Sequence, residues 1–298
     1  MACSQRQPQL IAMNVRSLIE QHLPDFSSSD TRIARLVLER YPVSALGGIE
    51  DLARQSDVSA PTVTRFVKRL GFQRFADFQR AIRLEVQDSE TSPLALFKKH
   101  QKSPNNSAIP DRLMVEQMSA SLNKLLDQPV QRSIDRAAEI IGDEKARIYL
   151  LGGRWSSIVA QYAAFQLTSL RGEVHVLAHQ ASGLREDRIA DFTRKDVLVV
   201  YDFRRYQAET IAFCQVAKQR GVRIVLFTDM DLSPAADVAN VVVPVTVETT
   251  SPTDTMAIAI AATDALLARL VKKLGASATK RMTLLETLRR QASDPNLH

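Results

Sequence analysis

The chain has 298 residues, 45% of them hydrophobic and 24% charged, which is typical of a globular protein of about two domains. This composition excludes disordered, collagen-like and coiled-coil chains. The two cysteines, Cys3 and Cys214, are too few for a disulfide framework or a zinc site of several thiolates. The N-terminal segment lacks the continuous apolar stretch of a signal peptide, and no apolar stretch is long enough to span a membrane. We therefore expect a cytoplasmic protein without a metal or cofactor, whose net charge of +6 favours an anionic partner.

The first 90 residues are predicted to be helical. Ser29 or Asp30 can cap the first helix, whose apolar residues recur at a helical spacing. Ser59 is the expected cap of a later helix, and Gly71 is expected to end that helix. The expected helices span about 30–41, 49–55, 60–70 and 75–87.

Two of these helices are arranged as a helix-turn-helix. A short helix at 49–55, a turn at 56–59 and a second helix at 60–70 have the spacing of that motif. The second helix should turn its apolar residues inward and its hydroxyl and basic residues outward, and such groups suit base edges and phosphates. The candidate DNA-binding residues are Ser59, Thr62, Thr64, Arg65, Lys68 and Arg69.

Positive charge is concentrated on this element. Between Ser59 and Arg83 six basic residues face one acid, Asp77, whereas the rest of the first ninety residues has six basic and ten acidic residues. This distribution favours nucleic-acid binding. The alternative that the residues alone leave open is the solvated face of an ordinary helix bundle.

The chain changes character after residue 90. The segment 102–110 is polar and rich in helix-breaking residues, which predicts a loop, and a bridging helix is expected at about 111–126. We therefore divide the chain into a DNA-binding domain, a linker with the bridging helix, a ligand-binding domain and a helical tail, at 1–90, 91–127, 128–275 and 276–298.

The second half alternates apolar stretches of strand length with helical patterns. Continuous apolar strands separated by helices predict a parallel sheet covered on both faces, a doubly wound α/β fold. The expected strands are 147–151, 174–177, 197–201, 223–227 and 241–244, and the expected helices are near 156–170, 183–190, 207–220, 233–238 and 254–273. The last of these helices is apolar nearly all round, so we expect it in a subunit interface.

The helix-turn-helix segment resembles a known family. The residues that carry the resemblance are Leu52-Ala53 in the first helix, Val58-Ser59 in the turn, and Thr62-Val63, Arg65-Phe66, Lys68 and Leu70-Gly71-Phe72 in the second. They resemble the N-terminal domain of the MurR/RpiR family of bacterial transcription regulators. In that family a C-terminal sugar-isomerase-type (SIS) domain follows, so the resemblance covers nearly the whole chain and implies DNA binding controlled by a ligand.

The loop after the first strand resembles the first loop of SIS domains, which usually reads Gly-x-Gly-x-Ser. Gly152 and Ser156 match this pattern, whereas Arg154 replaces the second glycine. Backbone N–H groups at such a helix start suit an anion. Ser156 and Ser157 are therefore candidate ligand hydroxyls, although a glycine pair after a strand is more often a simple connection.

The loop after the third strand departs further from the family. SIS domains that bind phosphosugars usually continue Ser-x-Ser-Gly-x-Thr at this point. Here Asp202 and Arg204 replace the two serines, Arg205 the glycine and Gln207 the threonine, while Glu209 still matches an acidic residue. The hydroxyl cradle that would hold phosphate is therefore lost.

Three interpretations of this loop stay open. Arg204 and Arg205 could clamp an anion, since guanidinium binds carboxylate or phosphate through two hydrogen bonds. They could instead be structural, paired with Asp202 or across a subunit interface, or the pocket could have lost its ligand. The ligand-binding candidates are Gly152, Arg154, Ser156, Ser157, Asp202, Arg204, Arg205 and Glu209.

The sequence therefore predicts a transcription regulator without catalytic residues. It would bind a pseudo-palindromic operator in double-stranded DNA as a homo-oligomer, a dimer or a dimer of dimers, and respond to a small anionic metabolite. The alternative is an aldose–ketose phosphosugar isomerase on the same α/β fold, in which the basic helix would have no role. A nucleotide-binding Rossmann domain is weaker, because the glycine-rich fingerprint and the acidic residue ending the second strand are missing.

Overall fold

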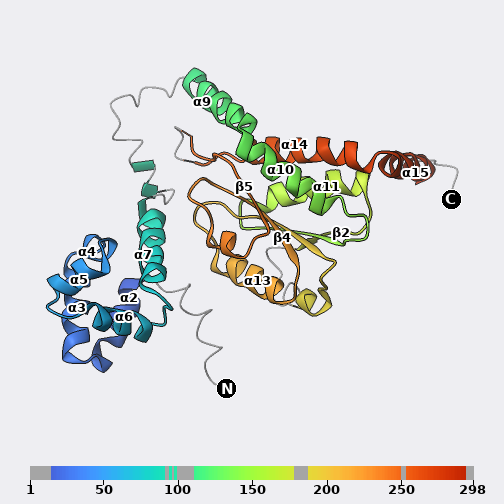
Figure 1. Ribbon diagram of the computed structural model, residues 1–298. Coiled ribbons are helices and arrows are strands. Elements are labelled where there is room, and N and C mark those ends of the chain that lie inside the picture. Colours follow the sequence, from blue (N-terminus) through green and yellow to red (C-terminus); the bar gives the residue numbers. More distant parts are fainter. Residues whose placement is uncertain are drawn as a thin grey trace. The chain divides into compact units, whose positions relative to one another are not determined.

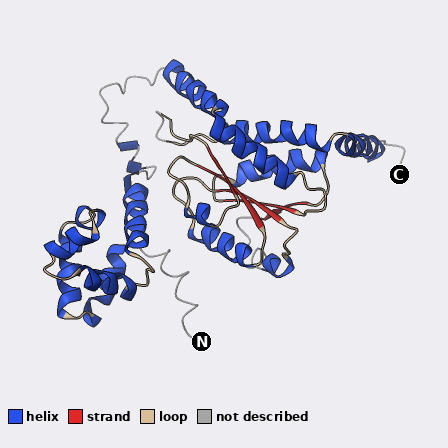
Figure 2. Cartoon of the chain, in the orientation of Figure 1, coloured by secondary structure: helices blue, strands red, loops and turns tan. Residues whose placement is uncertain are grey.

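The computed structural model describes residues 15–90, 94–95, 97–98, 111–177, 187–249 and 253–292. The chain divides into two compact units, Met1–Lys98 and Lys99–His298 (Figure 1). The first unit is helical in its described part, and the second is built around a sheet (Figure 2). No described helix is long and apolar enough to cross a membrane.

The helical unit is a bundle around an aromatic core. Its elements are α2 (Val15–His22), η1 (Leu23–Asp25), α3 (Ser28–Glu39), α4 (Val43–Leu46), α5 (Ile49–Gln55), α6 (Ala60–Arg69) and α7 (Phe75–Glu90). Phe66 and Phe78 are fully buried at its centre, with ring centroids 6.5 Å apart in an edge-on arrangement. Such aromatic pairs add to the stabilisation from burial alone.

The start of α3 differs from our prediction. The N-cap is Ser27, whose hydroxyl accepts from the backbone N–H of Asp30, while the Asp30 carboxylate accepts from the backbone N–H of Ser27. Asp30 is thus the N3 residue of a capping box, so the prediction of Ser29 or Asp30 as the cap was wrong by two or three residues.

The end of α6 confirms the role of Gly71. This glycine has φ of 95°, its N–H donates to the carbonyl of Lys68, and the N–H of Phe72 donates to the carbonyl of Val67. The two hydrogen bonds define a Schellman motif, which needs a left-handed residue at this position.

The second unit is a five-stranded parallel sheet in the order β2-β1-β3-β4-β5. The strands are β1 (Ile148–Gly152), β2 (Val174–Leu177), β3 (Val197–Tyr201), β4 (Arg223–Thr228) and β5 (Val241–Pro244). The predicted doubly wound fold and all five strands are confirmed, each end within one residue. Strand order reverses between β1 and β3, and ligands of such folds bind beyond the carboxyl ends of the strands at this switch point.

Helices cover both faces of the sheet. The elements are α9 (Asp111–Asn123), η2 (Lys124–Leu126), α10 (Gln128–Ile141), α11 (Ser157–Leu170), η3 (Arg188–Asp191), α13 (Ala208–Gln219), η4 (Pro234–Asp237), α14 (Ala257–Leu274) and α15 (Ala276–Ala292). The helix predicted near 233–238 is a short 3-10 turn. The helix predicted near 183–190 is described only from residue 187, where a short 3-10 turn at Arg188–Asp191 follows, because residues 178–186 lie outside the described residues.

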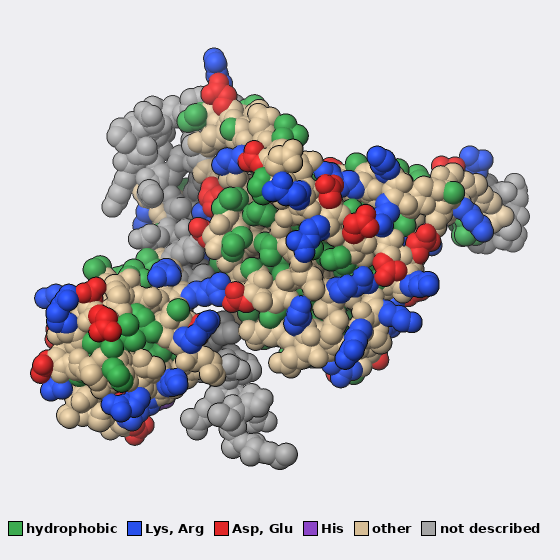
Figure 3. All heavy atoms as spheres, viewed as in Figure 1, with side chains coloured by type: hydrophobic (Ala, Val, Ile, Leu, Met, Phe, Trp, Pro, Cys, Tyr) green, Lys and Arg blue, Asp and Glu red, His purple; other side chains and the backbone are tan. Residues whose placement is uncertain are grey.

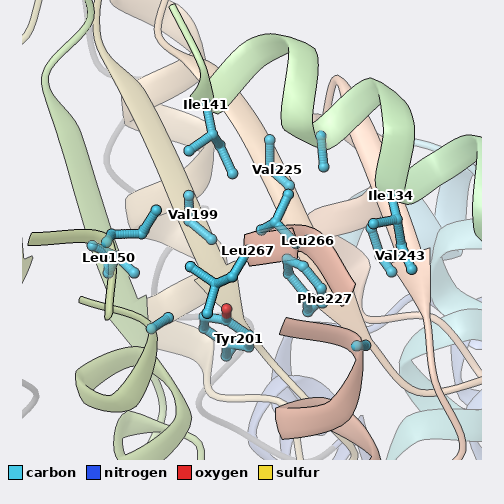
Figure 4. Packing of buried hydrophobic residues seen from close by; sticks show 14 of the residues in the cluster. Ile134, Ile141, Leu150, Val199, Tyr201, Val225, Phe227, Val243, Leu266 and Leu267 are labelled. Carbon is cyan, nitrogen blue, oxygen red and sulfur yellow. The ribbon is translucent and has the colours of Figure 1, made fainter. Parts of the chain in front are cut away.

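Alternate residues of each central strand face opposite sides of the sheet. Val199 and Tyr201 of β3 belong to the core under α10, α11 and α14, whereas Leu198 and Val200 belong to the core under α13. Figure 4 shows Tyr201 and Phe227 beneath Leu266 and Leu267 of α14. Because strands in this position are buried on both faces, they read as continuous apolar stretches in the sequence.

Burial within its own unit accounts for the apolar character of α14, and our prediction that this helix lies in a subunit interface stays a prediction. Its buried residues include Ile258, Ala259, Ala262, Leu266 and Leu270, which pack into the core of their own unit. This burial accounts for the composition from which we expected an interface. The composition of α14 therefore gives no support to an interface on this helix.

Candidate nucleic-acid interface and effector site

The turn between α5 and α6 is held by short-range hydrogen bonds. The Ser56 hydroxyl donates to the carbonyl of Leu52 at 2.6 Å, and the N–H of Val58 donates to the carbonyl of Ala53 at 3.0 Å. Asp57 adopts φ of 52°, a left-handed conformation that aspartate tolerates in turns. Because Val63, Phe66 and Val67 are buried on the inner side of α6, its opposite side is presented outward, as the sequence predicts.

Four of the six DNA-binding candidates are exposed, namely Ser59, Arg65, Lys68 and Arg69, and Thr62 and Thr64 are half-buried. The first turn of α6 forms a polar row in which the Ser59 and Thr62 hydroxyls lie 2.9 Å apart and the Arg65 guanidinium donates to the Thr62 hydroxyl at 3.1 Å. Ser59 is at the N-cap position, but its side chain makes no capping hydrogen bond. The Thr64 hydroxyl donates to the carbonyl of Ala60 at 3.2 Å.

Arg69 is engaged within the bundle. Its guanidinium donates to the Asp30 carboxylate at 2.7 Å, and that carboxylate is almost fully buried. The same carboxylate closes the capping box of α3. The ion pair therefore joins the end of α6 to the start of α3. Lys68, in contrast, makes no ion pair with any described residue.

The loop after β1 packs against the end of β3. The buried Ser156 hydroxyl donates to the carbonyl of Tyr201 at 2.5 Å and accepts from the N–H of Gly153 at 2.8 Å. A Cβ atom on Gly152 would lie 2.5 Å from the carbonyl oxygen of Ser156, so this position requires glycine. The Ser156 hydroxyl is thus occupied in holding the loop, and the half-buried Ser157 hydroxyl donates to the carbonyl of Arg154 at 3.3 Å.

Asp202 lies beneath the loop after β3. It is 2% exposed and accepts a hydrogen bond from the Ser233 hydroxyl at 2.5 Å. Burial raises the pKa of its carboxyl to about 7, and the nearby Asp229 carboxylate acts in the same direction. Asp202 is therefore part of the support of the loop, joined to the segment that follows β4.

Arg204 is paired inside its own unit. Its guanidinium makes two hydrogen bonds to the Asp254 carboxylate, one of them 2.9 Å from Nε to Oδ2, and lies 3.8 Å from Glu248. Its backbone N–H donates to the buried Asp229. This geometry agrees with the structural interpretation for Arg204, with Asp254 rather than Asp202 as the partner.

Arg205 and Arg154 have no such partners. Within the part of the chain that the structure describes, neither guanidinium makes a hydrogen bond or ion pair. Arg154 is exposed and Arg205 half-buried, and their loops are joined by a 3.0 Å hydrogen bond from the N–H of Arg154 to the Gln207 side chain. Arg205 has φ of 66°, a conformation unfavourable for a residue with a Cβ. Glu209 is exposed in the first turn of α13.

Sequence reasoning missed two residues of this network, Asp229 and Asp254. Asp229 is fully buried and accepts from the Tyr206 hydroxyl at 2.6 Å, and burial raises the pKa of the Asp229 carboxyl. Asp254 holds Arg204. The position of Asp229 directly after β4 was an available signal, since the carboxyl ends of adjacent parallel strands meet at one edge of the sheet. Nothing local to Asp254 pointed to its partner.

The described residues contain no group of histidine, cysteine or acidic side chains that could hold a metal ion. The sequence matches the helix-turn-helix domain of the rpiR family over residues 13–89 and the SIS domain over residues 140–269. The chain belongs to the RpiR family of transcription regulators. It is 23% identical to an uncharacterized HTH-type transcriptional regulator of Haemophilus influenzae, over 77% of this chain and 78% of that one.

Other relatives extend the comparison. The chain is 28% identical to the bifunctional protein glk of Burkholderia orbicola over 75% of its own length, but spans only 34% of that protein. Among solved structures, the sugar isomerase domain of an RpiR transcription factor from Sphaerobacter thermophilus has a TM-score of 0.55 and 24% identity, covering 60% of this chain and 98% of that one. The Vibrio vulnificus NanR protein complexed with ManNAc-6P has a TM-score of 0.50 and 18% identity, covering 94% of this chain and 100% of that one. Both share the fold.

Proposed function

We propose that this RpiR-family regulator acts in the cytoplasm, reads DNA with the first turn of α6 and changes its DNA affinity when a small anion binds at the switch point of the sheet. The observation that carries the DNA part is the polar row of Ser59, Thr62 and Arg65, which lies outward on a helix whose other side is buried. Residues at the start of the second helix of this motif are the ones that contact base edges.

We further propose that α6 docks in the major groove with Lys68 on a phosphate. Lys68 is exposed near the end of the helix. A lysine there contributes a charge contact that does not depend on the base sequence. Two copies of the chain would read the two halves of a pseudo-palindromic operator, because operator symmetry follows protein symmetry.

The effector part rests on the two unpaired guanidinium groups. Arg154 and Arg205 belong to loops that follow adjacent strands and that are joined through Gln207. Guanidinium binds carboxylate and phosphate oxygens through paired hydrogen bonds. The NanR structure contains a sugar phosphate, so sugar phosphates and short carboxylates are the first probes to test.

The alternative function, isomerisation of a phosphosugar, would need a free general base beside the substrate. The Asp202 carboxylate is buried and bonded to Ser233, and Asp229 is bonded to Tyr206. Both acids are occupied in supporting loops. These contacts favour a binding role over catalysis.

The experiment selects DNA ligands from a random-sequence library with the full chain and then measures the affinity of the selected site. We expect a two-fold symmetric site, weaker binding by Arg65→Ala, and a shift of affinity on adding one of a panel of sugar phosphates and carboxylates. Failure to enrich any sequence would refute the DNA-reading function. Conversion of an aldose phosphate to its ketose form by the purified chain would favour the isomerase.

A further inference from the structure

The hydroxyl groups in the loops after β1, β3 and β4 are all bonded to the protein itself. Each donates a hydrogen bond of 2.5–2.6 Å to a carbonyl or carboxylate oxygen, and the donors are Ser156, Tyr206 and Ser233. A sugar phosphate carries several hydroxyl groups that need hydrogen-bond partners once they are removed from water. These loops, which lie within the described residues, therefore offer such a ligand no hydroxyl that is free to bind it.

The Gln207 side chain closes the loop after β1. Its Oε1 atom accepts a hydrogen bond from the backbone N–H of Arg154 at 3.0 Å, and a Cβ atom added to Gly153 would lie 2.6 Å from the same oxygen. The backbone N–H of Gln207 donates in turn to the Asp202 carboxylate. A backbone amide that could hold an anion is therefore already taken. The guanidinium groups of Arg154 and Arg205 are the charged donors that remain unpaired among the described residues of these loops.

The charges around Arg154 and Arg205 favour an anion with a single charge. The carboxyl groups of Asp202 and Asp229 are buried beneath the loop after β3, and Glu209 is exposed where α13 leaves that loop. A phosphate monoester carries a charge of about −1.5 to −2 at neutral pH, whereas a carboxylate carries a single charge. Because Coulomb repulsion grows with charge, these acids oppose a phosphate more than a carboxylate. The paired donors of a guanidinium match the two oxygens of a carboxylate.

Three large apolar side chains are exposed on the same loops. Trp155 directly follows Arg154 and is 60% exposed, and in the loop after β4 Met230 is 57% and Leu232 40% exposed. Figure 3 shows hydrophobic side chains scattered among charged ones on the visible face of the second unit, and single exposed residues of this kind need no explanation. These three differ because their loops lie on either side of the loop after β3, which carries one of the two unpaired guanidinium groups.

Hydrogen bonds hold the loop after β4 against the backbone on both sides of Arg205. The Asp229 carboxylate accepts from the backbone N–H of Arg204 and from the Tyr206 hydroxyl. Met230 directly follows Asp229. The loop after β1 is held to the same segment by the glutamine contact described above, and the three strands are parallel. The apolar side chains and the guanidinium groups are therefore gathered at the carboxyl ends of neighbouring strands, where ligands of this fold bind.

We propose that the effector is an aromatic carboxylate, whose carboxylate binds Arg154 and Arg205 and whose ring packs among the three exposed apolar side chains, Trp155, Met230 and Leu232. This inference rests on the proposed function and names the ligand class of its effector site. Aromatic rings stack on an indole, and a methionine sulfur makes favourable contacts with them. A short carboxylate would use the guanidinium groups alone. A sugar phosphate would bring its hydroxyl groups against apolar side chains that cannot bond to them.

The test measures dissociation constants of the full chain by isothermal titration calorimetry, with phenylacetate, acetate and glucose 6-phosphate as probes. We expect phenylacetate to bind about tenfold more tightly than either of the others, because it alone uses both the guanidinium groups and the apolar side chains. Trp155→Ala should weaken phenylacetate binding about tenfold and leave acetate binding unchanged, and Trp155→Phe should restore most of the loss. Arg205→Gln should weaken the binding of both carboxylates. Val216→Ala is the matched control, since Val216 is an apolar residue 39% exposed within α13.

Thermal melts confirm that each variant is folded. Equal affinity for phenylacetate and acetate, tighter binding of glucose 6-phosphate, or a phenylacetate affinity that neither Trp155→Ala nor Met230→Ala lowers would overturn the proposal. Fluorescence anisotropy with the selected DNA site separates this inference from the function on which it rests. If glucose 6-phosphate, and not phenylacetate, changes the DNA affinity, the ligand class is wrong and the proposed function stands. If phenylacetate binds as expected but leaves the DNA affinity unchanged, the ligand class stands and the effector role is refuted.

Discussion

Lys68 and Arg69 are neighbouring exposed cations on α6, yet replacing each by alanine should have different consequences. Arg69 donates to the buried Asp30 carboxylate at 2.7 Å, whereas Lys68 has no such partner among the described residues. We expect Arg69→Ala to destabilise the helical unit, and Lys68→Ala to weaken DNA binding without changing stability.

The magnitude follows from the exposure of the ion pair. The Arg69 side chain is 47% exposed and that of Asp30 6%, so solvent screens the pair in part. A hydrogen bond to a charged group contributes about 1.5–3 kcal/mol when buried. The Asp30 carboxylate keeps its hydrogen bonds to Ser27 after the substitution. We therefore expect Arg69→Ala to lower the free energy of unfolding of this unit by about 1–2 kcal/mol.

Lys68→Ala removes one positive charge from the side of α6 that we propose contacts DNA phosphates. The logarithm of the association constant falls linearly with the logarithm of the salt concentration, and the magnitude of this slope should decrease by about 0.9 for each phosphate that is no longer neutralised. The decrease should be the same for operator and random DNA. Urea unfolding followed by far-UV circular dichroism measures stability, and fluorescence anisotropy at several salt concentrations measures DNA affinity. Unchanged stability of Arg69→Ala, together with a fall in its salt slope as large as that of Lys68→Ala, would refute these different roles for the two residues.

Further predictions concern base reading and the switch point. Arg65→Ala should lose about 1–3 kcal/mol of discrimination between operator and random DNA, measured by competition binding. Arg204→Ala leaves the partly buried Asp254 carboxylate unpaired and should destabilise the α/β unit by about 2–3 kcal/mol in thermal and urea melts. Arg205→Gly relieves an unfavourable φ and should stabilise the same unit by about 1 kcal/mol. It should also weaken the effect of an anion on DNA binding. Between about pH 4 and pH 7 the folded protein keeps a proton on Asp202 that the unfolded chain has lost. The Asp202 contribution to the free energy of unfolding should therefore fall as the pH rises through this window and level off above it. In urea melts between about pH 5 and pH 8, Asp202→Asn should remove about 2 kcal/mol of this decline.

The strands and the helix-turn-helix could be predicted from sequence because each rests on a local pattern. The central strands β1, β3 and β4 are buried on both faces and therefore read as unbroken apolar stretches. Gly71 could be placed because only a left-handed residue closes the end of α6. The segment near 233–238 was predicted as a helix, but Ser233 caps only a 3-10 turn at Pro234–Asp237, which is too short to continue.

The pairings at the sites could not be predicted because they join residues far apart in the chain. Arg204 and Asp254 are 50 residues apart, and Arg69 and Asp30 are 39 apart. Sequence shows that an arginine is present but not which carboxylate the fold brings to it. The composition of α14 could not distinguish two possibilities, since a helix buried against α10 and α11 is as apolar as one in an interface.

The adjacent arginines of the loop after β3 differ in their partners and in their backbone conformation. Arg204 is neutralised by Asp254 and holds the loop against the segment before α14. Arg205 adopts an unfavourable backbone conformation, and its guanidinium forms no hydrogen bond or ion pair within the described chain, so a bound anion is what would compensate for that cost. Burial raises the pKa of the Asp202 carboxyl beneath the same loop to about 7, so this carboxyl loses its negative charge as the pH falls through that value. The affinity of the proposed site for a carboxylate anion, whose own charge does not change in this range, should therefore rise as the pH falls through 7, and Asp202→Asn should remove this dependence.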